Sequence, residues 1–393
     1  MKNERFEKQM TVVEHQGIFR RQLSLFQAVA LIVSGTIGAG MLSLPYAIAK
    51  VGIGLGVTYI IAIGFLMMGL NILIGDVAMR TKQSFQLAGL ARTYLGPAGQ
   101  FLMTALMYSM LSGVLVVYII GEGDALSALF GGSPLRWSLL FFTVASLCIV
   151  LGMRTVKTVE MVLSMAVLLV ILLLTSISVP SVDLQHFQYI DVANIFFPYG
   201  IILFAFHSTT TIPEAYSLLR NKEHMFHRAI VIAGLIVMTV YVLFTTIVVG
   251  VTGPGTTEIA TIGLGSAVGP LVGTLGNIFA VLAMGTSFLI VGLAFRDSLQ
   301  WDFRLPSPLA TLLVCGIPCM IFLLGIRGFA SAISIIGGVL MSTELLLIIW
   351  IYLRARKTGI EIPGYPIPHV WALVVVLLLA FSAGVVYSVI NLF

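Results

Sequence analysis

The chain has 393 residues, of which 59% are hydrophobic and only 9% are charged, and its mean hydropathy is +1.07. A soluble globular domain carries about 25% charged residues, so the composition excludes this class and indicates a polytopic membrane protein. No stretch is long enough to form a soluble domain, and no loop carries a nucleophile or phosphate-binding motif, which argues against an enzyme.

Eleven stretches are apolar and long enough to cross a bilayer, whose hydrocarbon core is about 30 Å thick and takes about 20 helical residues. This pattern predicts an all-α membrane protein with eleven transmembrane helices. The predicted spans are residues 24–48, 52–79, 97–121, 135–152, 158–180, 192–219, 227–250, 267–295, 308–326, 330–353 and 368–391.

The positive charges predict the orientation of these spans. If the loops alternate between the two sides, all of the 21 Lys and Arg residues fall on one side except Lys50, Arg136 and Arg327. Such an excess marks the cytoplasmic side, so we expect a cytoplasmic N-terminus and an external C-terminus in a cell membrane, with short tails and loops favouring a prokaryotic inner membrane. The net charge of +5 then reflects topology, and no nucleic-acid partner is expected.

Residues 1–23 are mixed polar and charged, and no small-residue cleavage site precedes the first span. This segment is therefore expected to be a cytoplasmic tail and not a signal peptide.

The first span contains three glycines and a proline in the stretch SGTIGAGMLSLP, residues 34–45. Inside a helix, glycine costs about 1 kcal/mol and proline about 3 kcal/mol relative to alanine. Small residues allow two helices to pack closely. The alternative is an unwound segment, whose free N–H and C=O groups survive at membrane depth only where they line a cavity.

The sixth span has a comparable interruption, FAFHSTTTIPE at residues 204–214, in which a run of polar side chains precedes Pro213. Interrupted spans at matching positions in two halves are typical of transporters built from inverted repeats. We therefore expect a first repeat at 24–180, a second at 192–353 and an additional helix at 368–391.

Two half-helices that meet near the midplane would form a pocket with a predictable chemistry. Half-helix N-termini attract a carboxylate, and freed carbonyls attract an ammonium group or a cation. Gly38 and Gly40 would let a ligand approach the backbone, and no charged residue lies in 24–49 or 192–213. The expected ligand is a zwitterionic neutral amino acid. In the third span, Tyr108, Ser109 and Ser112 are expected to complete the pocket.

The eighth span carries Ala283, Thr286 and Ser287 on one helical face. Together with the carbonyls of Ser34 and Ile37 they would offer five oxygen ligands to a sodium ion. The alternative is that the hydroxyls bond only to carbonyls one turn back in their own helix.

The stretches GAGMLSLPYAIAKVG and FAFHSTTTIPEAYSLLRN resemble the amino acid/auxin permease family of the APC superfamily, which includes sodium-coupled neutral amino acid transporters and bacterial aromatic amino acid permeases. The resemblance implies a LeuT-type fold of two inverted five-helix repeats plus one further helix, with helices 1 and 6 discontinuous. It implies alternating access and a sodium ion between helices 1 and 8. The implied substrate contacts are Thr36, Gly38, Ala39, Gly40, Phe204, Phe206, His207 and Thr210.

Some proton-coupled relatives place a lysine in the middle of helix 5, but VEMVLSMAVLLV at residues 159–170 has none. This departure favours sodium as the driving ion. His207 and Glu344 nevertheless remain candidate proton sites, because ionisable groups inside the membrane are costly and mark function by default. Glu344 is expected to be the deepest carboxylate.

The sequence favours a sodium-coupled importer of a neutral amino acid, large or aromatic side chains included, acting as a monomer in the lipid bilayer. A proton-coupled symporter using His207 or Glu344 is the first alternative, and a receptor that binds an amino acid without moving it is the second.

Overall fold

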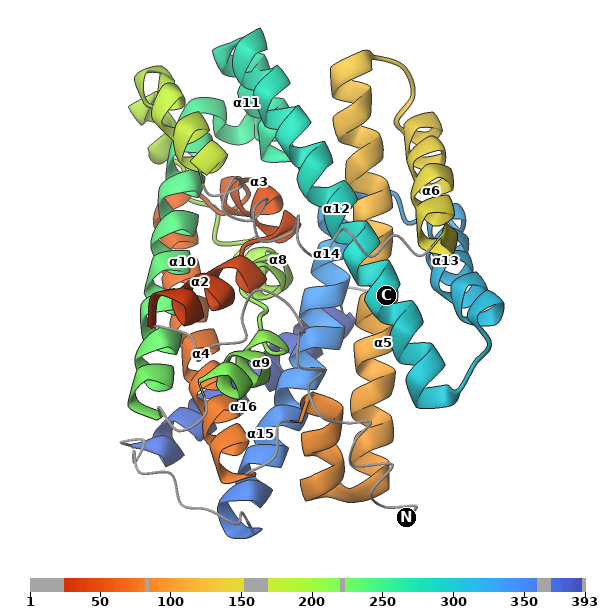
Figure 1. Cartoon of the computed structure of the whole chain (residues 1–393). Coiled ribbons are helices and arrows are strands. Elements are labelled where there is room, and N and C mark those ends of the chain that lie inside the picture. The colour runs from red at the N-terminus through yellow and green to blue at the C-terminus, as the bar shows by residue number, and fades with distance from the viewer. Residues whose placement is uncertain (1–24, 82–84, 152–168, 220–222, 359–368, 391–393) are drawn as a thin grey trace.

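The computed structural model describes residues 25–81, 85–151, 169–219, 223–358 and 369–390, and this part of the chain is almost entirely helical (Figure 1). The tail at 1–23 and residues 158–168 of the expected fifth span lie outside the described residues. The longer helices are α4 (Ile53–Arg80), α5 (Leu87–Phe130), α6 (Pro134–Leu151), α10 (Glu223–Thr252), α12 (Pro270–Phe303), α13 (Ser307–Leu323), α15 (Ser342–Thr358) and α16 (Val370–Ile390).

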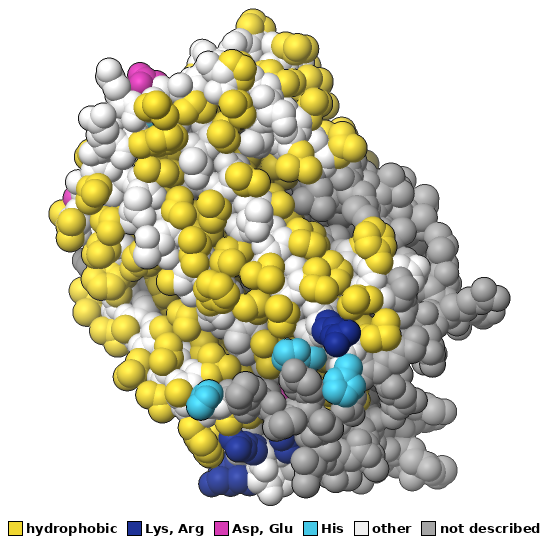
Figure 2. All heavy atoms as spheres, turned by 90° about the vertical axis from the view of Figure 1, so that its left-hand side faces the viewer, with side chains coloured by type: hydrophobic (Ala, Val, Ile, Leu, Met, Phe, Trp, Pro, Cys, Tyr) yellow, Lys and Arg dark blue, Asp and Glu magenta, His cyan; other side chains and the backbone are white. Residues whose placement is uncertain are grey.

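Most of these helices are suited to a membrane. Among the described residues, seven helical segments are long and apolar enough to cross a bilayer, and an eighth span results if the bent pair formed by residues 25–36 and 39–49 counts as one. Figure 2 shows a face covered by hydrophobic side chains, with Lys, Arg and His gathered near its lower end. The chain is therefore a multi-pass membrane protein.

The first apolar segment is bent in the described structure. Helix α2 (Leu25–Thr36) is followed by the 3-10 helix η1 (Ala39–Ser43) and by α3 (Leu44–Ala49), and the two parts meet at 54°. Gly38 is extended at the bend, and Pro45 lies in the first turn of α3, where its missing N–H costs nothing.

The sixth apolar segment consists of two short helices, α8 (Pro198–Ala205) and α9 (Thr211–Leu218), separated by the non-helical residues 206–210. They lie in the middle of the bundle in Figure 1, where η1 and α3 pack against α8 and α2 packs against α9. The two interrupted segments are thus neighbours along their whole length.

Helix α8 also packs directly on a distorted stretch of a long helical segment. After α14 (Phe329–Ile335) the chain forms the π-helix η5 (Ile336–Met341) before α15 begins. Glycines make the contact: a Cβ on Gly337 would lie 1.9 Å from the carbonyl oxygen of Gly200. A π-helix of this kind is rare and often accompanies a functional site.

Helix α5 differs from the expected third span. Gly96 takes a positive φ of 76°, and Pro97 begins a new helix there, so residues 87–95 form a separate helical piece. The helix then runs to Phe130, whereas the span was expected to end at 121. Glu122 and Asp124 therefore lie inside the helix, beyond the predicted end of the span.

Candidate functional site

A tyrosine on α10 joins the two interrupted segments. The Tyr241 hydroxyl lies 2.7 Å from the Ala205 carbonyl oxygen and 3.2 Å from the Thr36 carbonyl oxygen, and its side chain is fully buried. Both carbonyl groups are at the C-terminal ends of helices, where no N–H group of the same helix is available to donate to them. The single O–H group of Tyr241 is therefore shared between carbonyl oxygens of both interrupted segments.

The non-helical residues between α8 and α9 are linked to α15. His207 Nε2 lies 2.7 Å from Glu344 Oε2, and the Thr209 hydroxyl donates to Glu344 Oε1 at 3.2 Å and lies 3.1 Å from His207 Nε2. Glu344 is completely buried, while the His207 side chain is 15% exposed. The buried carboxylate is thus hydrogen-bonded to a side chain that is itself partly exposed.

A further contact connects this segment with α4. Asn71 Nδ2 donates to the Ser208 hydroxyl at 3.1 Å, and both residues are buried. Asn71 Oδ1 has no described hydrogen-bond partner. The segment at 206–210 is therefore held from three sides, by α4, α10 and α15.

The structure brings the expected substrate contacts into one neighbourhood but leaves them unequally accessible. Gly38 and Thr210 are exposed and His207 and Phe204 are half-buried. Gly40 packs against the Phe204 ring and the backbone of Ala205, so a Cβ there would lie 2.6 Å from Phe204 Cδ1. The buried members of the expected set are Thr36, Ala39, Gly40 and Phe206.

The five residues expected to bind sodium are divided between two helices that share no extensive interface. Ser34 and Ile37 belong to or follow α2, which packs mainly on α10 and α9, whereas α12 packs mainly on α5, α11 (Ala260–Val268) and α13. The Ser34 hydroxyl donates to the Leu31 carbonyl at 3.0 Å. The sodium site therefore stays a prediction.

The α12 members of that set also bond within their own helix. The Thr286 hydroxyl lies 2.7 Å from the Leu282 carbonyl oxygen and 3.2 Å from that of Ala283. Ser287 is half-buried. A hydroxyl that donates to a carbonyl still has oxygen lone pairs, so these hydroxyl groups remain chemically suited to bind sodium.

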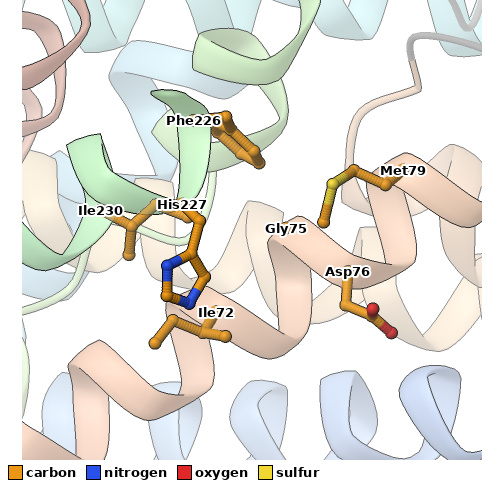
Figure 3. A pocket seen from close by; sticks show the side chains of 7 residues that line it. All are labelled: Ile72, Gly75, Asp76, Met79, Phe226, His227 and Ile230. Atoms are coloured by element: carbon orange, nitrogen blue, oxygen red, sulfur yellow. The ribbon is translucent and has the colours of Figure 1, made fainter. Parts of the chain in front are cut away.

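Two cavities lie elsewhere in the described structure. Tyr108, Ser109 and Ser112 line one of about 490 Å³ between α5, α12, α13, α14 and η5, and no residue of α2, η1, α8 or α9 lines it. The structure therefore places these three residues away from the interrupted segments. A smaller cavity lies between α4 and α10. There the His227 side chain points toward Ile72, and the Asp76 side chain points away from both of these residues (Figure 3).

Three residues of interest escaped sequence reasoning. Tyr241 and Asn71 each lie on a helix without a local interruption, and only their contacts reveal a role. Glu122 is fully buried in α5, although Glu344 was expected to be the deepest carboxylate. Glu122 directly follows the predicted third span, 97–121, and its apolar surroundings in the sequence could have pointed to a buried position.

Replacing Tyr241 with phenylalanine is expected to lower the free energy of unfolding by about 1–3 kcal/mol, because buried carbonyl groups lose their donor. Chemical denaturation of the purified protein in detergent measures the change. Tyr199→Phe is the matched control, since the Tyr199 hydroxyl bonds to the Ser342 hydroxyl and to no helix-end carbonyl. Equal loss in both variants would contradict the special role of Tyr241.

The family model described as the tryptophan/tyrosine permease family matches residues 21–391. The chain is a member of this family. Among its relatives, "Tyrosine-specific transport system 1" of Haemophilus influenzae is 26% identical over 383 residues, covering 91% of this chain and 94% of the relative. "Glutamine transporter 2" of Aliivibrio fischeri is 26% identical over 284 residues, covering 68% and 73%. The permease thus belongs with transporters and not with enzymes.

Solved structures show the fold of this permease. A crystal structure of MhsT in complex with L-phenylalanine matches with a TM-score of 0.66 at 13% identity, covering 95% of this chain and all of that one. The Eremococcus coleocola manganese transporter matches with a TM-score of 0.65 at 15% identity, covering 96% and 89%. These neighbours show a LeuT-type transporter fold. The expected kinship with bacterial aromatic amino acid permeases is confirmed, while membership of the wider amino acid/auxin permease group stays a prediction.

Proposed function

We propose that this permease imports a neutral amino acid with an aromatic or other large side chain, in symport with a proton that the His207–Glu344 pair binds. The observation that carries the proposal is the 2.7 Å contact between His207 Nε2 and Glu344 Oε2. It joins the interrupted segment to a buried carboxylate, and this supports a role for the two side chains in proton exchange close to the expected substrate contacts.

The pair has the properties that proton coupling requires. Histidine changes charge near neutral pH, and a carboxylate inside the membrane is costly unless it is paired or protonated. Glu344 is buried and His207 is partly exposed, so a proton can reach the carboxylate by way of the imidazole. Substrate arriving at residues 206–210 would alter the surroundings of the same imidazole and so couple the two ligands.

The names of the relatives and the chemistry of the segments support the substrate class. Tyrosine and glutamine are both neutral zwitterions, and the interrupted segments carry no formal charge of their own at 24–49 or 192–213. Phe204 precedes the interruption and Phe206 is its first residue; the half-buried Phe204 ring offers aromatic surface, whereas Phe206 is buried. Thr36, Gly38, Ala39, Gly40, His207 and Thr210 are the proposed partners of the amino and carboxyl groups.

We further propose eleven membrane crossings, with α2 and α3 as one discontinuous helix and α8 and α9 as another. The bend of 54° in the first segment and the gap at 206–210 support this arrangement. The repeats would be 24–180 and 192–353, followed by 368–391. The basic lower end in Figure 2 is consistent with a cytoplasmic side there and with an N-terminus inside.

In liposomes, an acid-outside pH gradient without sodium is expected to drive accumulation of tyrosine, phenylalanine, tryptophan or glutamine above equilibrium. A protonophore should abolish the accumulation, because it removes the gradient that drives it. The matched arm imposes a sodium gradient at equal pH. Accumulation in that arm alone would overturn proton coupling.

Sodium is the second candidate driving ion, because Ala283, Thr286 and Ser287 share one face of α12 and η1 packs against that helix. The carbonyls of Ser34 and Ile37 would supply the remaining two ligands. If sodium drives transport, Thr286→Ala should raise the sodium concentration needed for half-maximal uptake. Unchanged sodium dependence in this variant would remove the proposed site.

A further inference from the structure

The most isolated acidic group of the described structure lies in α5, away from the interrupted segments. Glu122 has an exposed fraction of 0%, and neither of its carboxyl oxygens has a hydrogen-bond partner among the described residues. Its Oε1 lies against α12, 2.9 Å from the position that a Cβ on Gly285 would occupy, and Phe141 of α6 borders the same position. The carboxyl group is therefore sealed between three helices.

Glycines produce this tight packing. A Cβ on Gly121 would lie 2.5 Å from Met284 Sδ of α12, and one on Gly123 would lie 2.0 Å from Ser138 Oγ of α6. Gly285 leaves the space that the Glu122 carboxyl fills. Small residues thus bring α5, α6 and α12 together at the level of the carboxyl group and exclude water from it.

No charged side chain compensates Glu122 within the described part of the chain. The charged residues with described side chains on α5, α6 and α12, apart from Glu122 itself, are Arg92, Asp124, the exposed Arg136, Arg296 and Asp297. Arg92 donates to Gln100, Asp124 interacts with Glu258, and Arg296 pairs with Asp297. The short helix α14, which packs near Gly121 through Phe329, has no charged residue. No hydrogen bond or ion pair joins any of them to Glu122 in the described structure.

We infer that Glu122 is a second proton-binding site, which is neutral while α5, α6 and α12 are packed as here and ionises only when they loosen. An unpaired carboxylate in a dry, apolar position is too costly to persist. Loss of the proton must therefore accompany entry of water or a change of helix packing. The inference deepens the proposed function and rests on proton coupling, but it concerns a different group from the His207–Glu344 pair.

The direct test is infrared difference spectroscopy of the purified permease between acid and alkaline pH. The wild type is expected to show the C=O band of a buried neutral carboxyl group, and Glu122→Gln should lose that band. Glu344→Gln is the control and should retain it. A Glu122→Gln spectrum identical to that of the wild type, or a wild type without such a band, would overturn the inference without bearing on substrate transport.

A second measurement follows the helix packing itself. Amide hydrogen exchange near residues 122 and 285, corrected for the intrinsic effect of pH, should increase at alkaline pH in the wild type. The increase should be lost in Glu122→Gln, whose side chain stays neutral. Glu122→Met serves the same purpose if the glutamine variant does not fold. A merely structural role predicts the same pH response in wild type and variants, and that outcome would refute the inference.

Discussion

Glu344→Gln is expected to reduce proton-driven accumulation at least about tenfold while leaving exchange of labelled for unlabelled substrate intact. Hydrogen bonds to a charged group contribute about 1.5–3 kcal/mol, and about 1.4 kcal/mol corresponds to a factor of ten. Glutamine preserves the shape that Thr209 and His207 contact but cannot exchange a proton. Uptake into liposomes with and without a pH gradient measures the two activities separately.

The neighbouring position supplies the control for this variant. The Thr343 hydroxyl donates only to the Val339 carbonyl of its own helix among the described contacts, so Thr343→Val should transport as the wild type does. His207→Gln should resemble Glu344→Gln, and the double variant should be no worse than either, because the two side chains act as one unit. Additive losses would show that they serve separate purposes.

Gly337→Val is expected to prevent stable folding or to lower the melting temperature more than any other substitution considered. The new Cβ would lie 1.9 Å from the carbonyl oxygen of Gly200 and 3.1 Å from the amide nitrogen of Phe204. Both are backbone atoms, so neither can rotate away as a side chain would. Overpacking of flexible side chains already costs about 1–3 kcal/mol.

Fluorescence-detected size-exclusion chromatography and thermal unfolding in detergent measure this effect. Gly316→Ala in α13 is the matched control, because no heavy atom lies within 4 Å of its added Cβ. The control should be as stable as the wild type or slightly more stable, since alanine is the better helix former. A stable Gly337→Val variant would show that α8 and η5 are not in backbone contact.

The sequence carried enough information to locate the interrupted segments, because glycine, proline and a run of hydroxyl side chains are conspicuous in an apolar span. It also singled out His207 and Glu344, since charged or titratable residues are rare there. Their pairing was not predictable. It depends on the rotation of α15, and the π-helix η5 that precedes Glu344 leaves no clear mark in the letters IGGVLM.

The contacts of Tyr241 and Asn71 and the burial of Glu122 could not be predicted from the sequence, for a related reason. Each lies in a continuous helix whose sequence alone does not say which neighbour it faces. Tyrosine and asparagine are ordinary residues in such helices, and their value here comes from two carbonyls and one hydroxyl on other segments. The burial of Glu122 depends on glycine packing between α5, α6 and α12, and the sequence does not show which helices are neighbours.

The single hydroxyl of Tyr241 that serves both Thr36 and Ala205 constrains how the molecule can change shape. If α2 or α8 moved alone, the Tyr241 hydroxyl would lose one of its two acceptors, and the carbonyl left behind would be buried without a donor. If α2, α8 and α10 move together, both contacts are kept. The conformational change with the lowest free-energy cost is therefore a concerted movement of these three helices. Intermediates in which only one half-helix has departed should be rare and short-lived.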